Sequence, residues 1–186
     1  MERHGAVAEV RAAPERLTLT AADGAAVECE PPFPPLEAGT VEGLLEHVRR
    51  ERTVGVLLVR LGGHAAGVFA GRRLVESKVG SRLVHGRHRK GGSSARRFER
   101  RRAEQARLAL EQAAGTAARI LLPHRDELDA LVLGGDRRAL AEVLEDARLA
   151  PLRSLVSERV LEVPEPRLDV LESAPDRFLA TRLTLR

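Results

Sequence analysis

Residues 53 to 61 have the sequence Thr-Val-Gly-Val-Leu-Leu-Val-Arg-Leu, an almost uninterrupted apolar run. A strand with this pattern is buried on both faces, so it belongs in the centre of a sheet that is covered on both sides. Two further β-like segments follow, Ala65 to Ala70 and Leu74 to Val79, and each is reached through a turn that contains glycine. The run therefore predicts a central strand that opens an antiparallel meander.

Helical and β-like segments alternate around this meander. Thr40 is a good N-cap for a helix over residues 41–48, and a sequence rich in Ala, Arg, Glu and Leu predicts a long helix from Ser93 or Ser94 to about Ala114, ended by Gly115. The pattern predicts an α/β fold with a mixed sheet and flanking helices. The remaining predicted elements are strands at 118–122, 130–133, 155–163 and 178–185, a helix capped by Asp136 and ending at Ala147, and a short helix at 167–172.

The N-terminal residues form a different kind of segment. Alternating apolar and polar residues on either side of Asp23-Gly24 predict a small β hairpin, and the run Pro31-Pro32-Phe33-Pro34-Pro35 interrupts regular structure. We therefore expect a hairpin with a proline-rich linker over residues 1–35 and an α/β domain over residues 36–186.

The positive charge of the chain is concentrated in one place. Between Arg87 and Arg107 there are nine Lys or Arg residues and two Glu, whereas the formal net charge of the whole chain is only +4. Local clustering of cations costs repulsion that a polyanion relieves, so the segment is typical of a nucleic-acid interface. Gly91 and Gly92 lie within it and would let backbone N–H groups approach an anion closely. The alternative is a surface turn followed by a solvated helix face.

The cysteine content and the lengths of the apolar runs indicate the cellular compartment. The single cysteine, Cys29, indicates a reducing compartment, and no apolar run approaches the roughly 20 residues that cross a bilayer, so we expect a soluble cytoplasmic protein.

Neither Gly62-Gly63 nor Gly134-Gly135 fits a dinucleotide or P-loop motif, so we expect no cofactor. His85 and His88 lack further ligands, so we expect no metal. Solvated turns or an N-cap explain the acids that a metal-dependent nuclease would need, namely Asp126, Glu127, Asp129 and Asp136.

The segment Arg87-His88-Arg89-Lys90-Gly91-Gly92-Ser93-Ser94-Ala95-Arg96-Arg97-Phe98, placed between the meander and the long helix, resembles the actinobacterial branch of the Vms-like release factors, the VLRF group. This group is related to the middle domain of eukaryotic and archaeal class I release factors. The resemblance extends from about residue 40 onward and implies an RNase H-like α/β fold. It also implies hydrolysis of the ester between nascent peptide and tRNA on stalled ribosomes.

Site residues follow from the resemblance. Gly91 and Gly92 match the family's loop glycines, which enter the peptidyl-transferase centre, while Ser93 and Ser94 stand at the two positions where relatives have Gln. The nearest glutamine is Gln105. The implied partners are rRNA of the large ribosomal subunit and peptidyl-tRNA, with no role for DNA or a membrane. The residues expected to contact RNA are Arg87, His88, Arg89, Lys90, Arg96, Arg97, Arg100 and Arg101. The alternative function is a ribosome- or RNA-binding factor that uses the same loop and helix without hydrolysis.

Overall fold

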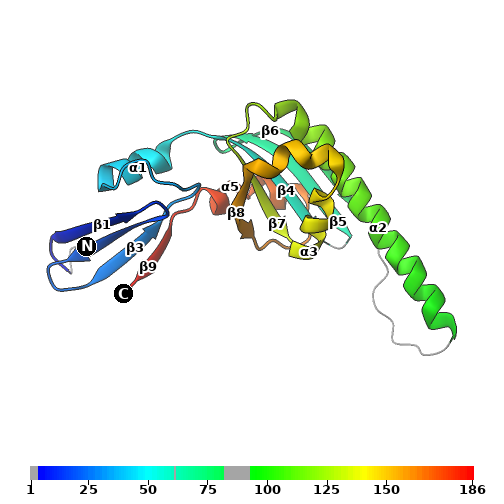
Figure 1. Cartoon of the computed structure of the whole chain (residues 1–186), viewed down its shortest axis with the longest axis horizontal. Helices are drawn as coiled ribbons and strands as arrows, with labels where there is room; N and C mark the ends of the chain where they lie inside the picture. Colours follow the sequence, from blue (N-terminus) through cyan, green and yellow to red (C-terminus); the bar gives the residue numbers. More distant parts are fainter. Residues whose placement is uncertain (1–3, 61, 82–92) are drawn as a thin grey trace. The chain divides into compact units, whose positions relative to one another are not determined.

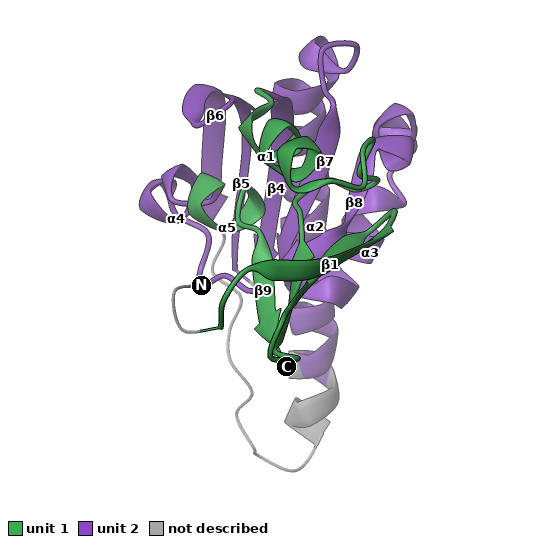
Figure 2. Ribbon diagram, turned by 90° about the vertical axis from the view of Figure 1, so that its left-hand side faces the viewer, with its two compact units in different colours: residues 1–51, 175–186 green, residues 52–174 purple. Residues whose placement is uncertain are grey.

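The structure is a computed structural model that describes residues 4–60, 62–81 and 93–186. Contacts divide the chain into two compact units, one of residues 1–51 with 175–186 and the other of residues 52–174 (Figure 2). The first unit contains the residues before the expected boundary at residue 35. It also contains the helix after that boundary and the C-terminal strand. The division into a hairpin with its linker and an α/β domain, between residues 35 and 36, stays a prediction.

The larger unit is built on a five-stranded mixed sheet with the order β6-β5-β4-β7-β8 (Figure 1). The first three strands in the chain form an antiparallel meander, and β7 and β8 then add in parallel on the other side of β4. This confirms the predicted mixed α/β architecture. The strands are β4 (Thr53–Arg60), β5 (Gly63–Ala70), β6 (Arg73–Ser81), β7 (Ala130–Gly135) and β8 (Val156–Leu161).

Strand β4 lies at the centre of the sheet, as its sequence predicts. Val54, Val56 and Leu58 point to one face and are fully buried, and Leu57 and Val59, which point to the opposite face, are at most 2% exposed. Complete burial of one such side chain contributes about 1.5–3 kcal/mol. The Leu57 face is the one that the long helix covers, because it packs in one core with Ala113, Ala117 and Leu121 of that helix and with residues of the helix α3 (Arg137–Leu144).

The long helix α2 (Ser93–Leu121) continues further than predicted. Gly115 lies inside it, and residues 118–121 form its last turn, so the strand expected at 118–122 is wrong. Ala114, Ala117, Ile120 and Leu121 are all at most 3% exposed, and their helical spacing shows that packing on the sheet outweighs the cost of one glycine. The 3₁₀ helix η1 (Leu122–His124) follows. Within the described ranges, no helix is both long and apolar enough to cross a membrane.

The remaining elements of this unit agree with the prediction in type but differ at their ends. Asp136 caps α3 (Arg137–Leu144), which stops before the predicted end at Ala147, and a 3₁₀ helix η2 (Ala147–Leu155) follows. Strand β8 is shorter than residues 155–163, and α4 (Leu168–Glu172) matches the predicted short helix. Leu171 of α4 packs over Gly67 on the face of the sheet opposite α2.

The smaller unit is a four-stranded antiparallel sheet with the order β1-β2-β3-β9 and one covering helix. The predicted hairpin is confirmed as β2 and β3, and β1 extends it. The Thr40 hydroxyl caps α1 by accepting from the Gly43 N–H at 3.0 Å, as predicted, and Leu44 of α1 packs on Leu17 and Cys29. The elements are β1 (Val7–Ala13), β2 (Arg16–Ala21), β3 (Ala26–Glu30), α1 (Val41–Arg49), α5 (Pro175–Phe178) and β9 (Arg182–Leu185).

The C-terminal prediction was partly wrong. Residues 178–185 were expected to form one strand, but Phe178 ends α5 and only Arg182–Leu185 are extended. The Phe178 side chain is 2% exposed, and its ring lies 6.1 Å from that of Phe33. Phe178 is thus buried at the end of a helical turn and is not part of the terminal strand.

Candidate nucleic-acid interface

The predicted interface falls on α2 and on the segment before it. Of the predicted site residues, Arg87, His88, Arg89, Lys90, Gly91 and Gly92 lie outside the described residues. Ser93, Ser94 and Arg96 belong to the first turn of α2, and Arg97, Arg100 and Arg101 follow in the next turns. Strand β6 ends at Ser81, so residues 82–92 connect the edge of the sheet to this helix.

Arg97, Arg100 and Arg101 share one side of α2 and are exposed. Residues three and four apart are neighbours on a helix surface, so the three guanidinium groups form a compact cationic patch, which we call the basic patch. Among the described residues, none of the three has an ion-pair partner. The N-terminal part of α2 extends beyond the sheet (Figure 1), which leaves these turns accessible to a large partner.

At Arg107, further along α2, the positive charge is neutralised within the protein. Arg107 forms ion pairs with Glu104 at 2.7 Å and with Glu111 at 3.3 Å, and these pairs raise the pKa of its guanidinium. Arg102 is only partly exposed and faces the groove described below. The basic patch is therefore limited to the first turns of the helix.

Gln105, the glutamine nearest in sequence to Ser94, lies well inside α2. Gln105 lies eleven residues after Ser94, which corresponds to about 16 Å along a helix. Its Oε1 atom is buried and has no hydrogen-bond partner among the described residues. Gln105 therefore lies apart from the start of α2.

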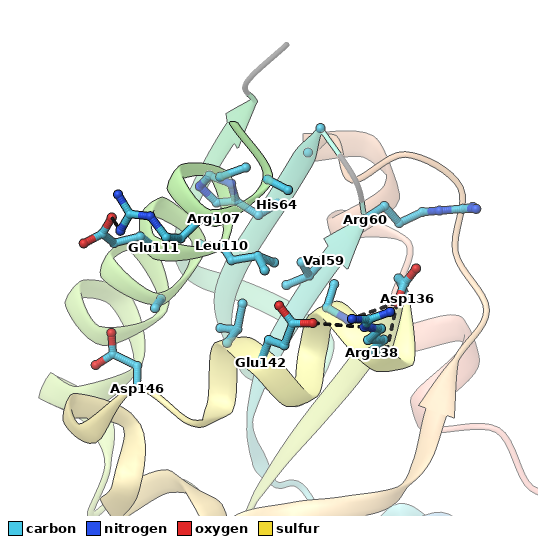
Figure 3. A pocket seen from close by; sticks show the side chains of 18 of the residues that line it. Val59, Arg60, His64, Arg107, Leu110, Glu111, Asp136, Arg138, Glu142 and Asp146 are labelled. Atoms are coloured by element: carbon cyan, nitrogen blue, oxygen red, sulfur yellow. Dashed lines mark hydrogen bonds and ion pairs between the residues drawn. The ribbon is translucent and has the colours of Figure 1, made fainter. Parts of the chain in front are cut away.

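A groove of about 690 Å³ runs between α2 and α3 over the end of β4 (Figure 3). Val59 and Leu110 form part of its apolar floor, and two ion pairs lie along its sides. Arg138 donates to Glu142 at 3.1 Å, and Arg107 donates to Glu111 at 3.3 Å. Because five carboxylates also line the groove, it offers a polyanion much less than the basic patch does.

The acids considered for nuclease chemistry occupy separate structural positions. Asp136 accepts from the N–H groups of Arg138 and Ala139, at 2.9 and 3.0 Å, as the N-cap of α3. Asp129 accepts from the Thr53 N–H at 2.8 Å, and Asp126 pairs with Arg125. In the described ranges, no group of His, Cys, Asp and Glu could hold a metal ion. The thiol of Cys29 is buried, which raises its pKa.

One residue near the interface received no role from the sequence. His64 belongs to β5, is 6% exposed, and its Nε2 lies 3.1 Å from the Thr116 hydroxyl of α2. Gly80 of β6 makes room for the ring, because a Cβ there would lie 2.5 Å from Nε2. Burial lowers the pKa of His64, so the ring is neutral at neutral pH. A polar residue within the apolar segment 63–70 was the available signal.

Comparison with known proteins agrees with this architecture. The chain is 32% identical over 103 residues to peptide chain release factor subunit 1 of Archaeoglobus fulgidus, covering 55% of this chain and 22% of that protein. It is 29% identical over 106 residues to the same subunit of Thermococcus sibiricus, covering 56% and 26%. The chain thus matches about a quarter of the length of these relatives.

A solved structure shows the same fold. The crystal structure of the archaeal translation termination factor aRF1 superposes with a TM-score of 0.52 at 17% identity, covering 86% of this chain and 49% of that one. The model of one protein family, described as the Actinobacteria/chloroflexi VLRF1 release factor, matches residues 52–184. This range includes the whole five-stranded sheet, α2 and its basic patch, and the chain belongs to the Actinobacteria/chloroflexi VLRF1 release factor family.

Proposed function

We propose that the protein is a peptidyl-tRNA hydrolase of the release-factor type that acts on stalled ribosomes in the cytoplasm. The observation that supports this most is the basic patch of Arg97, Arg100 and Arg101, which is exposed, has no ion-pair partner among the described residues, and directly follows the segment with Gly91 and Gly92. A patch of this kind binds phosphates through charge and releases counterions. Membership of a release-factor family makes the ribosome the expected source of these phosphates.

In this proposal the cations position the protein and the glycines reach the ester. Arg87, His88, Arg89, Lys90, Arg96 and the basic patch contact rRNA or tRNA phosphates, so that Gly91 and Gly92 enter the peptidyl-transferase centre of the large subunit. The absence of side chains at both positions lets the backbone approach the ester closely. Positioning of this kind lowers a reaction barrier by several kcal/mol without any ionisable side chain.

The chemical step needs only water. Its oxygen attacks the ester carbonyl, the bond between the carbonyl carbon and the tRNA ribose oxygen breaks, and the ribose hydroxyl leaves with a proton. Helix α2 begins at Ser93, and the first N–H groups of a helix have no partner within it. These N–H groups and the hydroxyls of Ser93 and Ser94 are the donors available to the water or to the developing oxyanion.

Release from stalled ribosomes tests the proposal. Purified protein is incubated with stalled ribosome–nascent-chain complexes, and peptidyl-tRNA is followed on a gel beside the Gly91→Ala/Gly92→Ala variant. We expect the wild-type protein to release the peptide, and we expect the variant to bind ribosomes but release at least tenfold more slowly.

The same experiment separates the second candidate function. Ser93 and Ser94 lack the amide that relatives have at these positions, which favours a factor that occupies the centre without hydrolysis. Binding without any release by the wild-type protein establishes that alternative. Absence of both binding and release rejects both.

A further inference from the structure

A second hollow, of about 320 Å³, lies on the side of α2 that faces the edge strand β6. Its polar lining is made by His64 of β5, Ser81 of β6, and Gln112, Thr116 and Arg119 of α2. These residues supply one guanidinium group, one amide, two hydroxyls and an imidazole, and the lining contains no carboxylate. Such a set of donors is suited to an anion.

The small volume and exposed rim of the hollow favour the binding of a single chemical group of a larger ligand. Its volume is at the lower end of the roughly 300–1,000 Å³ that is usual for ligand sites, and Ser81, Gln112 and Arg119 at its rim are exposed. A phosphate group on a continuous chain can enter such a hollow while its neighbours stay outside.

The floor of the hollow is fixed by a partly buried hydrogen bond. His64 is 6% exposed, and its Nε2 lies 3.1 Å from the Thr116 hydroxyl oxygen. When Nε2–H donates to that oxygen, the Thr116 proton is free to donate to a ligand in the hollow, and an anion favours this tautomer. Gly80 leaves the space that the ring occupies, since a side chain at this position would collide with it.

The hollow lies on the same helix as the basic patch but far from it along the helix axis. Arg119 lies 18 to 22 residues beyond the basic patch on the same helix, which is about 30 Å along the axis. This separation is much greater than the distance between successive phosphates. A polyanion that spans the helix would therefore meet two independent cationic points.

We propose that this hollow binds a backbone phosphate of RNA, as a second contact about 30 Å along α2 from the basic patch. Arg119 supplies the charge, Gln112 and Ser81 donate at the rim, and Thr116, oriented by His64, donates from the floor. The inference rests on the proposed function, because it takes the large ribosomal subunit as the source of the RNA.

Salt-dependent binding to purified large ribosomal subunits tests the inference. We expect Arg119→Gln to weaken binding by about tenfold and to reduce the slope of log K against log salt concentration by about one unit. Thr116→Val should weaken binding several-fold without changing the slope, because a neutral donor displaces no counterion. Thr116→Ser, which keeps the hydroxyl, should bind like the wild-type protein.

Arg137→Gln is the matched control. Arg137 is an exposed arginine at the start of α3 that does not line the hollow. Its replacement by Gln removes the same net charge as Arg119→Gln does. The control should leave the affinity and the slope unchanged. If Arg119→Gln and Thr116→Val both bind like Arg137→Gln while the wild-type protein binds subunits, the inference is overturned and the proposed function stands. If the wild-type protein does not bind subunits, both are overturned.

A free phosphate ion is distinguished from RNA by a titration of the isolated protein. Inorganic phosphate is added while the amide signals of Ser81, Gln112 and Arg119 are followed by NMR. We expect these signals to move weakly and without saturation in the millimolar range. Saturation below a millimolar concentration, together with unchanged subunit binding of Arg119→Gln, would assign the hollow to a free anion and overturn the RNA assignment.

Discussion

At the end of β7, Gly135 and Asp136 turn the chain from the sheet into α3. Gly135 has a φ of +107°, and a Cβ at this position would overlap the Val59 carbonyl oxygen of β4. The next N–H, that of Asp136, donates to the same oxygen at 2.8 Å. Glycine is therefore required for the close approach, and the approach places the Asp136 carboxylate at the start of α3.

The Asp136 cap predicts a measurable loss of stability. Asp136→Ala removes the acceptor for two N–H groups at the start of α3, so we expect the free energy of unfolding in urea to fall by about 1 kcal/mol. Asp136→Asn keeps an oxygen acceptor and should be close to the wild-type protein. Equal stability of the Ala and Asn variants would show that the cap contributes nothing.

His124 gives a pH-dependent prediction. Its Nε2 lies 3.0 Å from Glu76 of β6, and this hydrogen bond, more than the weaker one to Glu127 at 3.5 Å, raises the pKa of His124 above its ordinary 6.5. Because folding raises this pKa, the stability gained from the pair is complete below about pH 6.5 and is lost as the pH rises through the folded pKa.

We expect Glu76→Gln to lower the free energy of unfolding between about pH 5 and 6.5, and to have no effect above the folded pKa of His124. The pKa itself is measured by following the His124 ring protons by NMR, and it should be lower in the variant. A stability difference that is the same at all pH values would contradict this explanation, because only the charged ring gains from the pair.

At the scale of elements, α2 positions the proposed interface and the second hollow. Its C-terminal half packs Ala113, Ala117 and Leu121 on the sheet, and its N-terminal half bears the basic patch beyond the sheet. One helix with no proline in its interior connects the two halves. The proposed RNA contacts are therefore held by the core of the domain.

Two glycines in helices predict opposite effects of the same substitution. At Gly115 in α2 the nearest atom to an added Cβ is the Arg148 Nη1 at 3.8 Å, so Gly115→Ala should raise the free energy of unfolding by about 0.5–1 kcal/mol. At Gly43 in α1 an added Cβ would lie 2.6 Å from the Ala38 Cβ and 2.8 Å from its carbonyl oxygen. Gly43→Ala should therefore destabilise the protein. Urea unfolding of both variants checks the pair, and a gain at both positions would contradict the steric argument.

At the scale of the whole molecule, charge is divided between the two units. Residues 52–174 have more Lys and Arg than Asp and Glu, whereas residues 1–51 with 175–186 have the opposite balance. In the smaller unit, Arg11, Arg182 and Arg186 each pair with a glutamate, at 2.7, 3.3 and 3.2 Å. The net positive charge of the larger unit is therefore greater than the +4 of the whole chain.

This division gives a prediction that separates local charge from net charge. The triple change Arg97→Gln, Arg100→Gln and Arg101→Gln should reduce the salt slope of binding to large subunits by about three units if each arginine contacts one phosphate. The triple change Arg11→Gln, Arg182→Gln and Arg186→Gln removes the same net charge from the smaller unit and should leave the slope unchanged. Equal effects of the two triples would show that the binding responds to net charge alone.

The sequence was sufficient wherever a local rule and the tertiary structure agreed. The apolar run at residues 53–61 could be stable only between two covered faces, and Thr40 and Asp136 cap helices through contacts within three residues. The clustered arginines of α2 could also be found from sequence, since charge density depends on order along the chain. These features concern residues that are neighbours in sequence.

Contacts between distant residues decided the rest. Gly115 should end a helix by its own preference, but burial of Ala117, Ile120 and Leu121 on the sheet continues α2 past it. His64 gains its place only because Gly80 and Thr116, which are distant in sequence, surround its ring. The sequence by itself therefore determined the central strand, the helix caps and the basic patch, because each depends on local pattern or local hydrogen bonds. Only the tertiary structure determined the length of α2 and the hollow beside it, because both depend on packing between residues far apart in the chain.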